Sequence, residues 1–245
     1  MTTSAHLTRL IVGKVDVSCI GVGVDVGAVA RNTLDRTSFC DESRRFILGR
    51  NSPTFSVEAM FDNDGAAGTY WAEMTANHTN GTLLPVTVAP TGFADASGVW
   101  LADAYQMGYK PTVGADDAVD LGLEFEVTGT ALFGQSLDEF GAITTTANGA
   151  AIDGGAASTN GGFAHLHVTA VAGTTPTLDV VIEHSVNGST LWATLATFTQ
   201  ATTTTTTQRL TIAAGASVRR YVRAVYTVAG TGSPSYTTAV AFARA

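Results

Sequence analysis

Hydrophobic and polar residues alternate along most of the chain, which is the pattern of β-strands with one buried face. Two segments show this most clearly: 55–61, which begins at Phe55, and 121–128, in which Glu124 and Glu126 fall on the polar side. We expect strands at both places, each with one side in a core and the other in water. The strand at 121–128 would present carboxylates on its wet side.

Further strands follow from the same pattern, bounded by glycine, proline, asparagine and aspartate. They cover residues 7–12, 16–25, 83–89, 164–171, 178–184, 191–198, 208–212, 218–228 and 236–244. Pro85 cannot donate a backbone hydrogen bond, so we expect the strand 83–89 at a sheet edge or at a bulge. A mixed apolar pattern at 100–110 ends at Pro111, and Asn187-Gly188 is typical of a hairpin turn.

A single short segment has the pattern of a helix. Residues 69–77 begin with a threonine cap and place Tyr70, Trp71 and Met74 near one face. We interpret this face as part of a core, not as a ligand site. The sequence therefore predicts an all-β fold with one short helix.

Small residues, mainly glycine and alanine, dominate 140–162, and we place a domain boundary there. The predicted domains are 1–139 and 140–245, and the strand pattern of the second indicates a β-sandwich or jelly roll. Charge supports the division, because residues 1–140 hold 8 basic and 18 acidic side chains and residues 141–245 hold 5 and 3. The net charges are −10 and +2, which suggests different surroundings for the two parts.

The net charge of −8 argues against a protein that grips DNA. Cys19 and Cys40 do not make a disulfide framework in a chain of 245 residues, and we expect them to be reduced. No signal peptide is visible, and no apolar run reaches the roughly 18 residues of a membrane span. We therefore expect synthesis in a cytoplasm and no membrane partner.

Four groups of residues invite a reading as chemical sites. The glycines of 21–27 lack the spacing of a phosphate-binding loop, and the carboxylates Glu124 and Glu126 lack a substrate cleft. His165 and His167, with His184, could hold a metal, but we interpret them as histidines on a partly wet strand face. A fourth group, three arginines between 219 and 223, has no ladder of aromatic residues for nucleic acid. We expect no catalytic residue, no cofactor and no metal.

One stretch, 37–62, changes character twice: a charged start, turn residues at 49–53, and then the alternating strand that ends at Phe61-Asp62. Its start contains Thr37, Phe39, Asp41, Arg44 and Gly49 in the order T-x-F-x-[DE]-x-x-R-x-x-x-x-G. This order resembles the major tail tube proteins of long-tailed, siphovirus-type bacteriophages. The flanking segments 21–37 and 121–129 are also similar, so the resemblance covers about the first 140 residues.

The resemblance implies a tail-tube-type β-sandwich that closes into a homohexameric ring, with rings stacked head to tail by self-assembly. The virion tail so formed would be the conduit for DNA ejection, and genomic DNA would pass without specific binding. Other tail proteins, such as the tape measure, tail terminator and baseplate proteins, would be partners, and the cytoplasm in which the chain is made would be that of a host bacterium. The inter-subunit arm would contain Cys40, Asp41, Glu42, Arg44, Arg45 and Arg50. Candidate acids for lining the bore are Asp116, Asp117, Glu124 and Glu126.

Two other functions stay open from the sequence. The segment 184–192 resembles accessory β-sandwich domains of phage structural proteins, some of them similar to carbohydrate-binding modules. A glycan-binding module on a particle surface is therefore the alternative, although Trp71, Trp100 and Trp192 are scattered. An enzyme is the third possibility, and no constellation of nucleophile, acid or base supports it.

Overall fold

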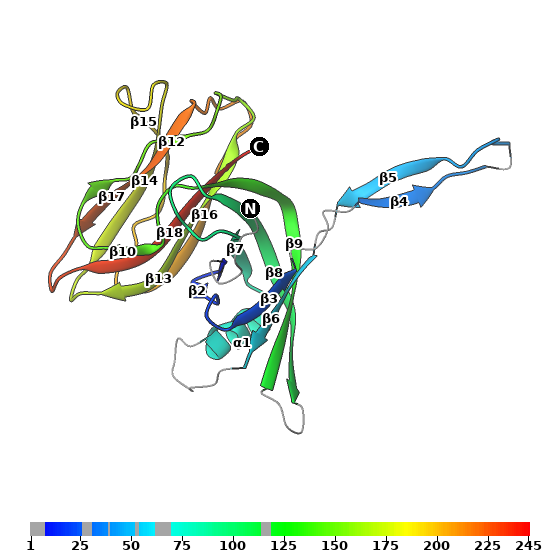
Figure 1. Cartoon of the computed structure of the whole chain (residues 1–245), viewed down its shortest axis with the longest axis horizontal. Coiled ribbons are helices and arrows are strands. Elements are labelled where there is room, and N and C mark those ends of the chain that lie inside the picture. Colours follow the sequence, from blue (N-terminus) through cyan, green and yellow to red (C-terminus); the bar gives the residue numbers. More distant parts are fainter. Residues whose placement is uncertain (1–7, 26–30, 39, 52–53, 62–69, 114–118) are drawn as a thin grey trace. The chain divides into compact units, whose positions relative to one another are not determined.

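The computed structural model describes residues 8–25, 31–38, 40–51, 54–61, 70–113 and 119–245. Within these residues the chain forms eighteen strands and one helix, which confirms the predicted all-β class (Figure 1). The elements of the first part are β1 (Arg9–Val12), β2 (Val15–Asp16), β3 (Gly21–Asp25), β4 (Arg31–Asp35), β5 (Phe46–Asn51), β6 (Thr54–Met60), α1 (Tyr70–Asn80), β7 (Leu83–Ala89), β8 (Gly98–Val113) and β9 (Val119–Ser136). Those of the second are β10 (Gly141–Ile143), β11 (Ala147–Asn148), β12 (Ile152–Asp153), β13 (Gly162–Ala172), β14 (Thr177–Ser185), β15 (Ala193–Thr197), β16 (Thr206–Ile212), β17 (Tyr221–Ala229) and β18 (Ser235–Arg244).

The chain divides into two compact units that are discontinuous in sequence. Unit 1 contains Met1–Cys19, Leu84–Ala102 and Ala131–Ala245, and unit 2 contains Ile20–Leu83 and Asp103–Thr130. Strands β8 and β9 therefore each contribute residues to both units. The predicted domain boundary between residues 139 and 140 coincides with none of the points at which the chain passes from one unit to the other. It stays a prediction.

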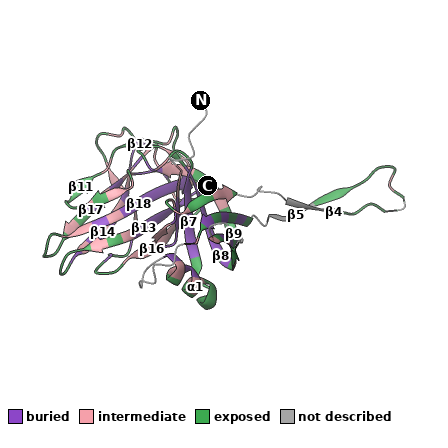
Figure 2. Ribbon diagram, turned by 60° about the horizontal axis from the view of Figure 1, so that its bottom comes forward, coloured by how far each residue is buried: buried purple, intermediate pink, exposed green. Residues whose placement is uncertain are grey.

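Unit 1 contains a β-sandwich, as the strand pattern of 140–245 predicted. Strands β16, β13, β18 and the end of β9 lie in one antiparallel sheet, and β11, β17, β14 and β15 form another. Apolar side chains of both sheets fill one core, among them Leu166 of β13, Ile182 of β14 and Tyr226 of β17. Figure 2 shows the buried residues in purple, running along β7, β13 and β18. All six strands expected between 163 and 244 are present, with ends shifted by a few residues.

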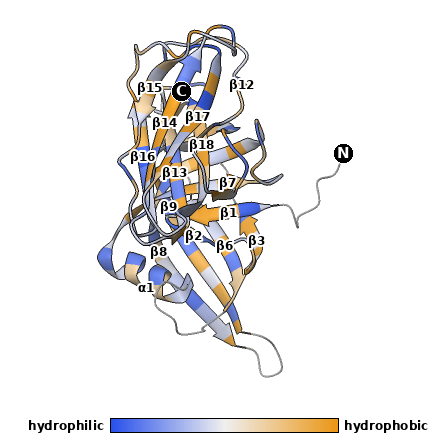
Figure 3. Ribbon diagram, turned by 90° about the vertical axis from the view of Figure 1, so that its left-hand side faces the viewer, coloured by the Kyte–Doolittle hydropathy of each residue, from blue (hydrophilic) through white to orange (hydrophobic). Residues whose placement is uncertain are grey.

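A second cluster in unit 1 joins residues from both sides of position 139. Ile11, Phe93 and Leu101 pack with Phe163 and Ala241, and all five side chains are buried. Figure 3 shows the hydrophobic residues of β1 in orange. Residues 1–139 and 140–245 thus share apolar packing within one compact unit.

Strand β7 lies between β8 and β1 in the sheet, so of the two positions predicted for the strand with Pro85, a sheet edge or a bulge, the sheet edge was wrong. The missing N–H is tolerated because the register with β1 begins one residue later, at Val86 opposite Val12. The carbonyl of Pro85 still accepts a hydrogen bond from the backbone N–H of Gly13, at 2.8 Å.

Unit 2 is built around the antiparallel strands β3, β6 and β9. The alternation predicted for 55–61 is confirmed, since every second residue of β6 is buried, beginning with Phe55. Phe55 stacks on Phe125 of β9 with ring centroids 4.3 Å apart. Helix α1 begins at Tyr70 and extends to Asn80, three residues beyond the prediction, and it buries Tyr70 and Met74. The mixed apolar pattern at 100–110 belongs to strand β8, which continues through Pro111 to Val113.

Strands β4 and β5 form a two-stranded antiparallel sheet of their own, seen in Figure 1 as two blue arrows side by side. Leu34 lies opposite Ile47, and Asp35 lies opposite Phe46. The turn expected at 49–53 was wrong for residues 49–51, which are in β5, while 52–53 lie outside the described residues. The chain reverses instead between Arg36 and Arg45, whose backbone groups form a 2.8 Å hydrogen bond.

Candidate functional site

The tip of the β4–β5 hairpin is held by local hydrogen bonds to two aspartates. Asp41 accepts from the backbone N–H of Ser38 at 2.8 Å and from the Ser38 hydroxyl at 2.9 Å. These two bonds hold the pKa of Asp41 below its ordinary value, because they favour the charged form. Arg45 forms an ion pair with Asp41 at 3.0 Å, and Asp35 accepts from the backbone of Thr37. The predicted arm residues Asp41 and Arg45 are therefore brought together.

The other predicted arm residues do not share this contact. Cys40, Glu42 and Arg44 are exposed at the hairpin tip, and Arg50 lies in β5 with its side chain outside the description. Among the described strands, β4 and β5 pair only with each other. Phe46 and Ile47, at the start of β5, are 55% and 47% exposed. The hairpin thus combines a polar tip that hydrogen bonds hold together with two exposed apolar residues, Phe46 and Ile47.

A face of unit 2 carries carboxylates on two neighbouring strands. Glu124 and Glu126 of β9 are exposed, as predicted, and Glu58 of β6 is exposed on the same side, because Ser56 pairs with Glu124 and Glu58 with Gly122. An open hollow of about 300 Å³ borders this face. Its polar lining includes Asp25, Thr54, Ser56, Glu124 and Glu126. We call this surface the carboxylate face. Asp116 and Asp117, the other predicted acids, lie outside the described residues.

The histidines that could have been metal ligands occupy a different environment from the one expected. His165 and His167 are fully buried, so the prediction of a partly wet strand face was wrong. Thr87 lies between them, with its hydroxyl oxygen 3.0 Å from Nδ1 of His165 and 2.8 Å from Nε2 of His167. His184 instead accepts a hydrogen bond from the backbone N–H of Arg219 at 3.3 Å. In the described part of the chain no three metal-ligating side chains gather.

Two further expectations concern cysteine and glycine residues. Cys19 and Cys40 are both exposed and free. The glycine-rich segment from Gly21 to Asp25 is strand β3, paired with β6, and not a phosphate-binding loop. No helix in the described residues is long and apolar enough to cross a membrane.

The chain was compared with protein families, curated proteins and solved structures, and only the solved structures gave matches. No family model matches the chain, and no curated protein matches it. A protein in the virion of the native gene transfer agent particle is 12% identical, with a TM-score of 0.41 over 54% of this chain and 98% of that one. The Dit protein of phage SPP1, a hub of the adsorption apparatus, is 11% identical, with a TM-score of 0.40 over 97% of this chain and 99% of that one.

A protein from the sheath-tube complex of the PVC extracellular contractile injection system is 10% identical, with a TM-score of 0.40 over 55% of this chain and 92% of that one. The assemblies concerned are a gene transfer agent virion, a phage adsorption hub and a sheath-tube complex. TM-scores below 0.5 do not establish a common fold, so the function of this chain has to come from its own residues.

Proposed function

We propose that this chain is a structural subunit of a phage tail tube. In this proposal residues 1–139 form the ring, and residues 140–245 are an accessory part on the tube exterior. The rings stack into a conduit for genomic DNA, and the protein is not an enzyme. The β4–β5 hairpin is the observation that carries the proposal.

A two-stranded hairpin is marginally stable in water unless something covers one of its faces. In the described part of the chain β4 and β5 have no third strand, and Phe46 and Ile47 are about half exposed. The hairpin also contains most of the residues that resemble the tail tube family, including Thr37, Asp41 and Arg44. A neighbouring copy of the chain is the partner that would bury its apolar residues while the charged tip forms ion pairs.

The carboxylate face supports the second half of the proposal, which is passage of DNA. Exposed Glu58, Glu124 and Glu126 place negative charge on one sheet face. Such a face repels phosphates, whereas each added lysine or arginine would release counterions from DNA and increase affinity. The ring of six copies, the head-to-tail stacking and the tape measure, tail terminator and baseplate partners come from the family resemblance.

Negative-stain electron microscopy of the purified full chain tests this function. The expected result is tubes or stacked rings of uniform diameter, in a sample whose light scattering shows assemblies far larger than the 25.2 kDa monomer. Monodisperse monomers at all concentrations up to the solubility limit would contradict the proposal.

A further inference from the structure

A surface on one edge of unit 1 gathers most of the charge of the second half of the chain. Residues 141–245 contain five arginines, no lysine and three acidic residues. Arg219, Arg220, Arg223 and Arg244 lie around two of those acids, Asp153 and Glu183. The full charge of +2 is therefore concentrated here. We call this surface, together with Trp192 and Tyr221, the arginine surface.

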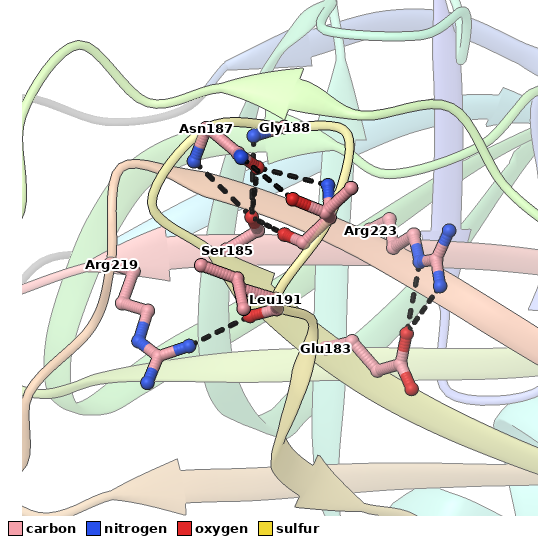
Figure 4. Close-up of polar contacts among 8 residues, drawn as sticks. Glu183, Ser185, Asn187, Gly188, Leu191, Arg219 and Arg223 are labelled. Carbon is pink, nitrogen blue, oxygen red and sulfur yellow. Dashed lines mark hydrogen bonds and ion pairs between the residues drawn. The ribbon is translucent and has the colours of Figure 1, made fainter.

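One part of it is a stack of three side chains. Glu183 of β14 lies opposite Arg223 of β17, and Arg223 donates from Nε and Nη2 to the same oxygen of Glu183, at 2.9 and 2.7 Å (Figure 4). The guanidinium carbon of Arg223 lies 4.1 Å from the ring centre of Trp192. Since Arg223 covers one face of the indole, the partly exposed remainder of Trp192 is available to a ligand.

A second stack repeats these residue types next to the first. Tyr221 and Arg223 are two residues apart on β17, so they lie on one side of the strand about 7 Å apart. Arg220 lies over the ring of Tyr221 at 5.1 Å and forms a bidentate pair with Asp153 at 2.8 and 2.6 Å. This pair lowers the pKa of Asp153 to about 2, since the guanidinium bonds favour the carboxylate.

A rigid loop borders both stacks. Ser185 and Asn187 fix it. The side-chain oxygen Oδ1 of Asn187 accepts from the backbone N–H groups of Ser189 and Thr190, and the Ser185 hydroxyl accepts from the N–H of Gly188 (Figure 4). Gly188 has φ 73° and lies against the Tyr221 ring so closely that a Cβ there would be 2.8 Å from a ring carbon. No larger residue fits this contact without displacing the ring.

Leu191 ends the loop in the left-handed region at φ 56°, which is unfavourable for a leucine, and the residue is 69% exposed. Arg219 holds this conformation by donating from Nη1 to the Leu191 carbonyl at 2.8 Å. Strained backbone that the surrounding contacts enforce is common at binding sites. Within the described residues Arg219 has no carboxylate partner, so its charge is not neutralised locally.

We propose that the arginine surface binds an anionic polysaccharide. Trp192 and Tyr221 are both partly exposed, and the part of the Trp192 indole that Arg223 leaves uncovered offers an apolar surface to a sugar ring. Guanidinium groups bind carboxylates in a planar fork. The net positive charge selects an acidic polymer over a neutral one. Burial lowers the pKa of His184, and the charges of Arg219 and Arg244 lower it further. Assembly of the chain into a tube is not required for this binding.

Double-stranded DNA is a poorer fit for the same surface. Duplex DNA carries one charge per about 1.7 Å, so it suffers much stronger repulsion from a chain of net charge −8 than a polymer with one charge per sugar does. Arg220 and Arg223 also lie against aromatic rings and are already paired with Asp153 and Glu183.

Binding of the full chain to polygalacturonate, which carries a carboxylate on every sugar, tests the site, with dextran as the neutral polymer. Isothermal titration should detect polygalacturonate binding that weakens as salt increases, and no dextran binding. Arg219→Gln should weaken polygalacturonate binding by about tenfold, the loss of one charge-assisted contact. Trp192→Ala should weaken it by at least about fivefold through loss of the ring face.

Lys110→Gln is the matched control, because it removes one exposed positive charge from unit 2 and should leave binding unchanged. Circular dichroism and thermal unfolding of each variant separate loss of binding from loss of fold. No binding of polygalacturonate at millimolar concentration, equal binding of dextran, or equal weakening by Lys110→Gln would overturn the proposal. So would tighter binding of duplex DNA, or an effect of Arg219→Gln on self-association alone.

Discussion

The proton positions in the buried histidine pair follow from the atoms that surround it. The carbonyl oxygen of Gly13 lies 2.6 Å from Nδ1 of His167 and can only accept, so this nitrogen carries the proton. Nε2 of His167 must then accept from the Thr87 hydroxyl, whose oxygen accepts from Nδ1–H of His165. The Thr87 hydroxyl and both ring nitrogens of His167 have partners as long as His167 is neutral.

We therefore predict that stability falls as pH falls below about 6.5. The pKa of His167 is lowered to about 3, first by burial and second by the charge of His165, whereas the unfolded chain has the ordinary value of 6.5. The unfolded state thus binds a proton between these values and the folded state does not. Stability is complete above pH 6.5 and decreases toward pH 3, with a limiting slope of about 1.4 kcal/mol per pH unit from this residue.

Urea unfolding followed at several pH values measures this slope. In His167→Gln the slope between pH 4 and 6.5 should be smaller, although stability at pH 7 will be lower because the bond to Thr87 or Gly13 is lost. His78→Gln, on the exposed side of α1, should keep the wild-type slope. The explanation fails if His167→Gln and wild type have the same pH dependence.

The alternation in 163–168 was visible in the sequence, but the burial of His165 and His167 was not. Ala164, Leu166 and Val168 mark one face of β13 as apolar, so the histidine face seemed wet. In the structure seven successive residues of β13 are buried, because Thr87 and Gly13 cover the other face. Contacts between residues about 80 and 150 positions apart leave no local pattern.

Among the elements, the hairpin is the part that the sequence described least well. The strand from Phe55 could be predicted because its partner β9 gives it one buried face. Among the described strands β4 and β5 pair only with each other. Their residues, among them Phe46, Ile47 and the polar Asn51, show no alternation in the sequence. A turn was therefore assigned to residues that belong to β5.

Replacing residues 31–51 with a short glycine-serine linker should give a folded subunit that does not assemble. The hairpin makes its strand pairs internally, so its removal leaves β3, β6 and β9 intact. We expect the thermal unfolding midpoint to change by a few degrees at most, and light scattering to report monomers. A matched control places glycine and serine at the exposed Thr203 and Thr204 of unit 1, outside the hairpin, and should still assemble.

Full-length tubes from the linker variant would show that the hairpin is not the assembly arm. If the linker variant is insoluble, hydrogen exchange on wild type gives a second test. On assembly, hydrogen exchange should slow at the backbone amides of β4 and β5. The exchange rates of β14, which lies in the sandwich of unit 1, should change less between unassembled and assembled protein.

For the whole molecule, the packing around Phe163 bears on whether the first 141 residues fold without the rest. Phe163 and Ala241 are buried against Ile11, Phe93 and Leu101, so a chain that ends at Gly141 loses this cover. Phe163 alone contributes about 2 kcal/mol by burial. We expect the fragment 1–141 to be insoluble or unstable, and to be recovered when residues 142–245 are expressed with it. A soluble fragment with a cooperative thermal transition would show that the predicted boundary is also a folding boundary.

The carboxylate face allows a test of how DNA would pass through an assembled tube. In wild-type tubes the exposed Glu58, Glu124 and Glu126 should prevent retention of DNA, because bound phosphates gain affinity only from added positive charge. In Glu124→Lys/Glu126→Lys tubes, DNA should co-sediment at low salt and be released as salt rises, with a slope of about −0.9 for each phosphate contacted. Asp95→Lys/Glu139→Lys makes the same change of charge at exposed positions of unit 1 and is the matched control. Equal retention by both pairs of substitutions would mean that total charge decides, and that this face does not line the bore.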